Sequence, residues 1–253
     1  MASLANQVIL HPFITSSLKV GSTSVGRDKL YRTIQYFSRF LVWFLQSNGY
    51  DKLTITRFNN LKSALGVSRK LFRLGKPLEH LQAALKATKT SSDPVVSTLA
   101  IGRQLSYSMY LFNDMLIWAD KIKFIFLDKT TLATVNQRAA RFWMAGIAMN
   151  LVSSILQLYQ IRKKVLSLKR DKYHNRNEEE KEDHKKYQIK SYLKQSTGLR
   201  LQLIQDSCDI LSPTSTLGYH SLNDGVIGAA GVVSSILGLR SQINKVLTNS
   251  SAK

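Results

Sequence analysis

Apolar residues recur at helical spacing along most of the chain, and the first clear example lies near the N-terminus. The segment GRDKLYRTIQYFSRFL occupies residues 26–41, and apolar side chains return in it every three or four positions. This period predicts an amphipathic helix, and Asn48-Gly49 is a typical helix end. The basic and apolar residues of this predicted helix are Arg27, Lys29, Leu30, Arg32, Ile34, Phe37, Arg39, Leu41 and Phe44.

A second amphipathic helix with a basic side is predicted over residues 57–76. Its apolar side carries Leu61, Leu65 and Phe72. The basic stripe beside it consists of Lys62, Arg69, Arg73 and Lys76. Pro77 then breaks or restarts the helix, because proline lacks the backbone N–H that a helix interior needs. Both stretches have two interpretations: bundle helices with solvated charges, or helices that lie on a membrane.

The longest apolar run, FWMAGIAMNLVSSILQLYQI, covers residues 142–161 and contains no charged residue. Its length at about 1.5 Å rise per residue spans roughly 30 Å, the thickness of the hydrocarbon core of a bilayer. Phe142, Trp143 and Tyr159 lie near its ends, where aromatic residues meet the membrane interface. We therefore predict a transmembrane helix, with a buried helix of a soluble protein as the alternative.

A second uncharged run, GVIGAAGVVSSILGL, covers residues 225–239 and is shorter than a full span. Small residues recur along one side of it, and small faces let membrane helices approach closely. The predicted helix-packing face consists of Gly225, Gly228, Gly231, Ser235 and Gly238. The same glycines are also compatible with a turn in a soluble protein. The intervening residues 162–200 are highly charged and predict a solvated loop or an exposed helix.

The formal net charge of +20 narrows the class of partner. A charge of this size indicates nucleic acid or an anionic lipid surface, because net charge bears on partners and not on fold. No zinc-finger or RNP signature is present, and a soluble nucleic-acid reader has no use for two strongly apolar segments. We therefore expect an anionic phospholipid membrane as a partner and no nucleic acid.

Motifs for catalysis are absent from the sequence. It contains no G-x-x-x-x-G-K-[ST] loop for phosphates, no G-x-G-x-x-G after a strand, no G-x-S-x-G and no H-E-x-x-H. The five histidines are scattered without metal-ligand spacing. These absences predict a protein that is not an enzyme and has no catalytic residues, cofactor or metal site.

Four stretches of the chain, taken in order, resemble the peroxin-eleven family of peroxisomal membrane proteins in its fungal form. They are GRDKLYRTIQYFSRFL, SRKLFRLGKPLEHLQAALK, YLFNDMLIWADKIKFI and GVVSSILGL. The resemblance implies a protein that inserts basic amphipathic helices into one leaflet, bends the membrane and promotes fission. By position, it assigns lipid-binding charges to Lys62, Arg69, Lys70, Arg73 and Lys76. It assigns membrane insertion to Leu61, Leu65, Leu71 and Phe72.

The resemblance also implies partners and a location. The expected partners are further copies of the chain and a dynamin-type fission GTPase with its adaptors. The expected location is the peroxisomal membrane, in which the protein is integral and both termini face the cytosol. Some members of the family are associated with solute passage. The alternative function is therefore a non-selective solute or ion channel, with Asn113, Asp114 and Asp120 as candidate pore residues.

We expect an all-α fold, a membrane-associated bundle of amphipathic helices with one or two transmembrane helices. Residues 1–95 form the membrane-remodelling region of basic amphipathic helices and residues 96–141 the central helices. The transmembrane candidate at 142–161 precedes the charged loop or helix at 162–200, and a hydrophobic helix with a short tail follows at 201–253. Ser167 lies beside a basic cluster and is a candidate phosphorylation site, because a phosphate there would weaken attraction to lipid.

Overall fold

The computed structural model describes residues 10–88, 93–174 and 179–251, and all regular structure in these ranges is α-helical. The predicted all-α fold is therefore confirmed. The helices are α2 (Pro12–Gly21), α3 (Ser24–Ser47), α4 (Lys52–Leu71), α5 (Lys76–Ala87), α6 (Pro94–Lys121), α7 (Lys129–His174), α8 (Glu179–Asp209), α9 (Leu211–Thr216) and α10 (Asp224–Ser251).

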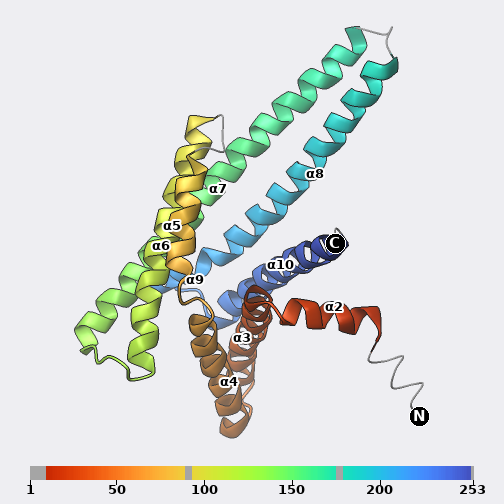
Figure 1. Ribbon diagram of the computed structural model, residues 1–253. Coiled ribbons are helices and arrows are strands. Elements are labelled where there is room, and N and C mark those ends of the chain that lie inside the picture. The colour runs from red at the N-terminus through yellow and green to blue at the C-terminus, as the bar shows by residue number, and fades with distance from the viewer. Residues whose placement is uncertain (1–9, 89–92, 175–178, 252–253) are drawn as a thin grey trace, which may run out of the picture.

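Helices α3 and α4 form a hairpin with clear start and stop signals in the sequence. The Thr23 hydroxyl accepts a hydrogen bond from the Gly26 N–H at 3.0 Å and caps the start of α3. Gly49, at φ +69°, lets the chain turn after α3. The Asp51 carboxylate accepts a hydrogen bond from the Thr54 N–H at 2.7 Å and caps α4. The two helices then pack side by side (Figure 1).

The single helix predicted over residues 57–76 is two helices in the structure. Helix α4 ends at Leu71, a turn over residues 72–75 follows, and α5 begins at Lys76. Gly75 has φ +81°, a left-handed conformation that favours glycine. Pro77 occupies the first turn of α5, where its missing N–H costs nothing. The chain therefore restarts its helix at the proline, and the basic residues at 73 and 76 lie beyond α4.

Helices α7 and α8 form a long antiparallel hairpin whose far end extends beyond the rest of the molecule (Figure 1). Helix α7 has 46 residues and is roughly 70 Å long at about 1.5 Å per residue. The predicted transmembrane segment 142–161 is thus the middle of a longer helix. The charged residues 162–200 are helical wherever the structure describes them, because they continue α7 and form most of α8.

The helices form two groups that meet near α9. In one group α5 packs on α6, α6 on α7 and α7 on α8, and in the other α3 packs against α2, α4 and α10 (Figure 1). Contacts of α4 with α6 and of α8 with α10 join the two groups. Arg32 and Asp209, 177 positions apart in the sequence, meet at this junction.

Polar residues dominate the buried positions of the fold. In the described part of the chain, sixteen polar or charged residues are buried, against eleven aliphatic ones. Asp and Arg are almost never fully buried in soluble proteins unless they are paired. Each of the seven longest helices also exposes large apolar side chains. Helix bundles in lipid share this arrangement, because their ionisable residues face the bundle interior.

Candidate functional site

A cavity with many charged side chains in its walls lies at the junction of the two helix groups. It has a volume of about 460 Å³ and is lined mainly by residues of α3, α4, α5, α6, α7 and α8. A second cavity of about 470 Å³ adjoins it between α3, α4 and α6. Gln35, Tyr36 and Lys70 line both cavities. The two cavities therefore form one polar interior, and we call them the first and the second cavity.

The predicted basic stripe lines these two cavities. Arg69, Lys70, Arg73 and Lys76 line the first cavity, and Lys62 and Lys70 line the second. Arg69 is buried and the other four are partly buried. The structure thus directs toward the interior the side chains that were expected to contact lipid headgroups. The physical reason is that the three central residues have acidic partners inside the molecule.

Arg69 joins α4 to α3. Its Nε donates to the Asp28 carboxylate at 3.0 Å, and its guanidinium also donates to the Gln35 side-chain oxygen at 2.6 Å. Burial raises the pKa of Asp28, but the nearby Arg69 and Arg73 outweigh burial and hold that pKa below its usual value. Burial and the adjacent Arg73 lower the pKa of Arg69. The pair is therefore an ionic contact between two buried groups.

Lys70 and Arg73 share one acceptor on α6. Lys70 forms an ion pair with Asp114, and Arg73 contacts the other oxygen of that carboxylate at 2.9 Å. Arg73 also donates to the Tyr110 hydroxyl at 3.0 Å, and Tyr110 stacks on Trp143 of α7 with ring centroids 5.3 Å apart. Burial lowers the pKa of Lys70, and Asp114 offsets this in part. The pKa of Arg73 is raised despite its burial, because Tyr110 and Asp114 favour its charged form.

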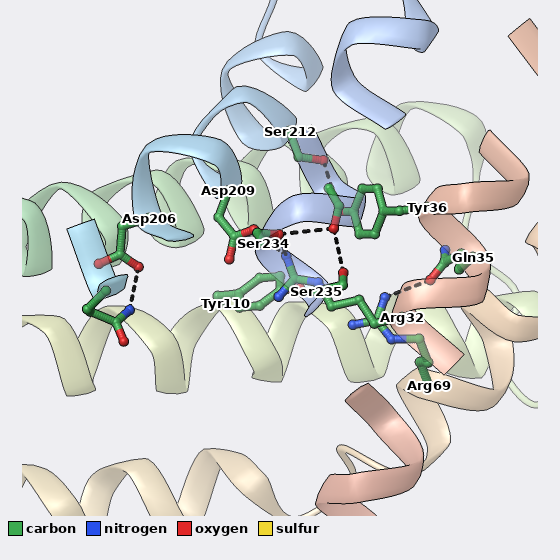
Figure 2. A network of polar contacts seen from close by, with 12 residues as sticks. Arg32, Gln35, Tyr36, Arg69, Tyr110, Asp206, Asp209, Ser212, Ser234 and Ser235 are labelled. Carbon is green, nitrogen blue, oxygen red and sulfur yellow. Dashed lines mark hydrogen bonds and ion pairs between the residues drawn. The ribbon is translucent and has the colours of Figure 1, made fainter. Parts of the chain in front are cut away.

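A second polar network joins α3, α8 and α10 (Figure 2). Arg32 forms a buried ion pair with Asp209 and donates to the Ser234 hydroxyl at 3.1 Å. Tyr36, one helical turn further along α3, donates to the Ser212 hydroxyl at 3.4 Å. The pKa of Arg32 is raised despite its burial, because Asp209 lies against it. Removing either charge would leave the other buried without its partner, which is costly.

Positive charge is in excess around the first cavity. Seven Lys or Arg side chains and four Asp side chains line it. Burial and the neighbouring Arg32 lower the pKa of Lys29 to about 8. Within the described residues, the buried Nε atoms of Arg32 and Arg103 have no hydrogen-bond partner. The walls of the first cavity are therefore short of negative charge and of hydrogen-bond acceptors.

Sequence reasoning missed Arg103, Asp206 and Asp209 as residues of this interior. The two aspartates lie three residues apart in the apolar stretch LQLIQDSCDIL, so they share one side of α8. Acidic residues within an apolar helical stretch favour buried pairing, and this signal is present in the sequence. For Arg103 the sequence holds no comparable signal, because a single arginine in α6 is compatible with a solvated position.

The apolar stripe of α3 faces outward. Ile34, Phe37 and Phe44 expose 45%, 49% and 41% of their surface. Arg32 and Arg39, on the other side of the helix, pair with acidic residues of α8 and α10. The amphipathic helix was predicted correctly as an element, but its charged side packs inside the molecule. Of the other residues predicted for it, Arg27 is exposed, and Lys29, Leu30 and Leu41 are partly buried.

The four residues of 57–76 that were predicted to insert into the membrane differ in their exposure. Leu61 and Leu71 are exposed, whereas Leu65 and Phe72 are partly buried. Phe72 packs against Tyr31 of α3, with ring centroids 5.6 Å apart. Only the two exposed leucines are therefore placed to contact a surrounding lipid or solvent phase.

The small-residue face of α10 packs against α3. A Cβ at Gly225 or Gly231 would lie 2.3 or 2.0 Å from an aromatic side chain of α3. A Cβ at Gly228 would lie 2.7 Å from the backbone nitrogen of Phe40. These glycines therefore permit a close approach of two helices within one chain.

The same face continues along α10 through Ser235 and Gly238. Ser235 is fully buried, and its hydroxyl donates to the Gly231 carbonyl at 2.5 Å. A Cβ at Gly238 would lie 3.4 Å from the Lys29 ammonium. All five predicted packing residues thus lie on the side of α10 that contributes to the interior of the molecule.

The three residues predicted to line a channel have contacts within the chain. Asp114 pairs with two basic residues, as described above. The Asp120 carboxylate accepts a hydrogen bond from the Leu127 N–H at 3.1 Å, and the Asn113 amide donates to the Met109 carbonyl at 2.8 Å. These contacts stabilise the helix ends and the bundle, and they give no specific support to a pore.

Two further predictions concern the outer part of the molecule and metal binding. Ser167 is exposed on α7, and its hydroxyl donates to the Lys164 carbonyl at 2.9 Å. It stays a candidate phosphorylation site. Among the residues that the structure describes, no group of three or more His, Cys, Asp or Glu side chains is placed to hold a metal ion.

In the part of the chain that the structure describes, two helices are long and apolar enough to cross a membrane, Lys129–Arg170 within α7 and Asp224–Thr248 within α10. Only 33% of the most apolar window of each is buried inside the structure. Most of this apolar surface therefore faces outward, whereas the core helix of a soluble protein is mostly buried. Together with the buried ion pairs, this defines the class of the protein as a helical membrane bundle with a polar interior.

Comparison with known proteins identifies the family within this class. Residues 14–243 match Peroxisomal biogenesis factor 11 (PEX11), and the chain belongs to this family. The Peroxisomal membrane protein PMP30B of Candida boidinii is 29% identical, over 92% of this chain and 95% of its own. The Peroxisomal membrane protein PMP27 of Saccharomyces cerevisiae is 29% identical over 94% and 97%. Peroxisomal membrane protein 11A of Rattus norvegicus is 27% identical over 88% and 93%. No solved structure matches the chain.

Proposed function

We propose that this protein is an integral protein of the peroxisomal membrane that bends and elongates the membrane and promotes peroxisome fission and proliferation. Membership of the family supports this proposal. The names of its relatives, which are peroxisomal membrane proteins and a peroxisomal biogenesis factor, support the location. The observation that carries the proposal is the outward apolar stripe of α3, which lies beside a helix long enough to cross a membrane.

The bending step is insertion of this stripe into one leaflet. Helix α3 packs along α10, on which Val233 and Ile236 are also exposed. Full burial of a Leu or Phe side chain contributes about 1.5–3 kcal/mol, so Ile34, Phe37 and Phe44 together hold α3 in lipid even when burial is partial. Because α3 packs along α10, the two helices enter the leaflet together. A helix pair at a depth of roughly 5–10 Å expands that leaflet and favours positive curvature.

The attraction to anionic lipid comes from basic residues that the interior does not use. Arg27, Lys52 and Arg57 are exposed at the start of α3 and in α4. Each basic side chain near an anionic surface contributes about 1 kcal/mol. These three residues take the role that the sequence pattern had assigned to the basic stripe.

The proposal includes two kinds of protein partner. Self-association concentrates inserted helices and sustains a tubule, and a dynamin-type fission GTPase with its adaptors then cuts it. The α7–α8 hairpin extends beyond the rest of the bundle and is rich in charged residues, which suits it to contact a soluble partner (Figure 1).

Liposome tubulation tests the insertion step. Changing Ile34, Phe37 and Phe44 to Ser should abolish tubulation of acidic liposomes while the helical content measured by circular dichroism is unchanged. The matched control is Tyr187→Ser, because Tyr187 is an aromatic residue that exposes 74% of its surface on α8. Tubulation that survives the triple substitution, with the protein still bound to the liposomes, would contradict the mechanism.

A further inference from the structure

We propose that the first cavity binds a phosphate-bearing anion, either the headgroup of a phospholipid or a small soluble phosphate compound. This inference goes beyond membrane bending, because it concerns the interior of the bundle and not its outer surface. It rests on three observations: the excess of positive charge, the two arginines with unpaired donors, and the size of the cavity.

The charge around the cavity is not balanced by the chain itself. Its walls carry seven Lys or Arg side chains against four Asp. Three of these aspartates, Asp28, Asp114 and Asp209, each already contact at least one of the basic residues. No Asp or Glu oxygen of the described residues lies within 4.0 Å of Arg103, which contacts the ring of Tyr107 at 5.3 Å. A bound anion supplies the missing negative charge.

The hydrogen-bond donors of the cavity are also in excess. Arg32 exposes only 8% of its surface and lines the cavity, yet its Nε has no acceptor. The buried Nε of Arg103, in the same wall, has none either. A buried donor without an acceptor is unfavourable, and the guanidinium fork matches the oxygens of a phosphate group. Phosphate is therefore the anion that best completes these two side chains.

The volume and the remaining walls indicate an organic phosphate. A cavity of about 460 Å³ falls in the range of about 300–1,000 Å³ that small-molecule sites occupy. His80 and Tyr107 stack in its wall with ring centroids 5.5 Å apart, and Gln202 and Gln205 contribute amide groups. These side chains provide a flat surface and neutral hydrogen-bonding groups beside the arginines.

Two substitutions with opposite expected effects separate binding from folding. Arg103→Gln removes a cavity cation that lies within 4.0 Å of no described carboxylate; burial raises the pKa of Asp206, and the nearest effect of the Arg103 charge is to lower it. Asp206→Asn removes a cavity carboxylate that is 3% exposed. That carboxylate accepts hydrogen bonds from Gln202, at 2.9 Å, and from Asn150, and the asparagine oxygen can accept one of the two. Arg170→Gln is the control, because it changes the net charge by the same amount at an exposed position of α7 that does not line the cavity.

The experiment uses the full chain in nanodiscs of phosphatidylcholine. Inorganic phosphate is titrated by calorimetry in one arm. In the other arm, phosphatidic acid is added to the nanodiscs at a fixed mole fraction, and the bound lipid is counted by native mass spectrometry. Cholesteryl hemisuccinate, an anionic lipid without phosphate, serves as the charge control. Binding in the first arm alone identifies a soluble ligand, and binding of phosphatidic acid alone identifies a lipid headgroup.

Arg103→Gln should weaken binding about tenfold, the effect of one lost charge-assisted hydrogen bond. Asp206→Asn should strengthen binding, and Arg170→Gln should leave it unchanged. A higher affinity of Asp206→Asn would support the proposed anion site even if Arg103→Gln does not fold, because damage to the fold does not raise affinity. Absence of binding in both arms overturns the proposal. An Asp206→Asn variant that keeps the helical content of the unaltered chain and binds no better than that chain also overturns it.

Discussion

At single residues, the charges of α3 and α4 act as bonds between helices. Arg32 reaches α8 and α10, Arg69 reaches α3, and Arg73 reaches α6. Each of these guanidiniums has lost most of its contact with water, so its partner determines its free energy. Replacing such a residue therefore affects folding before it affects any surface property.

Arg69→Ala should lower the free energy of unfolding by about 3–5 kcal/mol, because it leaves the Asp28 carboxylate buried without its partner. Denaturant unfolding in detergent micelles, followed by circular dichroism, measures this loss. Arg57→Ala, at an exposed position of the same helix, should change stability by no more than about 0.5 kcal/mol. The double variant Asp28→Ala with Arg69→Ala should be more stable than Arg69→Ala alone. If Arg69→Ala and Arg57→Ala had the same free energy of unfolding, Arg69 would not be paired inside the protein.

The burial of these charges also affects how a role of the basic stripe in lipid binding is tested. The sequence pattern alone would lead one to change Arg69, Lys70 and Arg73 to Glu and to measure lipid binding. All three side chains line the cavities and contact acidic groups, so this triple variant should lose its fold. A loss of tubulation in such a variant therefore says nothing about headgroup contact.

Among the elements, the packing of α3 on α10 depends on glycine. The three glycines at 225, 228 and 231 lie one turn apart on the side of α10 that α3 covers. Their missing side chains let the aromatic residues of α3 approach the backbone of α10. A helix pair of this kind brings the outward stripe of α3 close to the apolar surface of α10.

Gly228→Ala should destabilise the protein by about 1–3 kcal/mol, because its Cβ would meet the Phe40 backbone at 2.7 Å and backbone cannot move aside cheaply. Gly198→Ala is the matched control in α8, since nothing lies within 4 Å of a Cβ there. It should stabilise the protein by up to about 1 kcal/mol through helix propensity. Thermal unfolding of both variants gives the comparison. If Gly228→Ala changed only the oligomeric state measured by light scattering, the face would serve contact between copies.

In the whole molecule, many large apolar side chains are exposed, and several charged ones are buried. Phe37 on α3 and Ile155 on α7 are exposed, whereas Asp28, Arg32 and Asp209 are buried. In water, both the exposed apolar side chains and the buried charges would be unfavourable. In a bilayer this distribution is the stable one, because lipid solvates the apolar exterior and the interior pairs its own charges.

A fluorescent label should report this orientation directly. In a Cys208→Ser background, a label on Phe37→Cys should be quenched by brominated lipids and protected from aqueous iodide. The same label on Tyr187→Cys, in the charged part of α8, should show the reverse. Quenching of both labels by iodide alone would mean that α3 lies outside the membrane.

Much of the fold could be predicted from particular residues. Thr23, Asp51 and Pro77 mark where α3, α4 and α5 begin, since caps and prolines act locally. The end of α4 at Leu71 was harder to predict, because residues 72–75 continue the apolar and basic pattern of the helix. Of the polar interior, the basic residues of α3 and of residues 69–76 were singled out from the sequence, whereas Arg103, Asp206 and Asp209 were not.

The amino-acid pattern was enough to establish that the chain is helical, where its apolar runs lie, and to which family it belongs. The side of each amphipathic helix that faces inward became known from the packing of the helices. A helical period separates an apolar side from a charged side, but it does not say which of them meets the surroundings. Arg32 faces inward because Asp209, 177 positions away, lies against it. That choice depends on distant partners and on the surrounding medium, and neither is written in the local pattern.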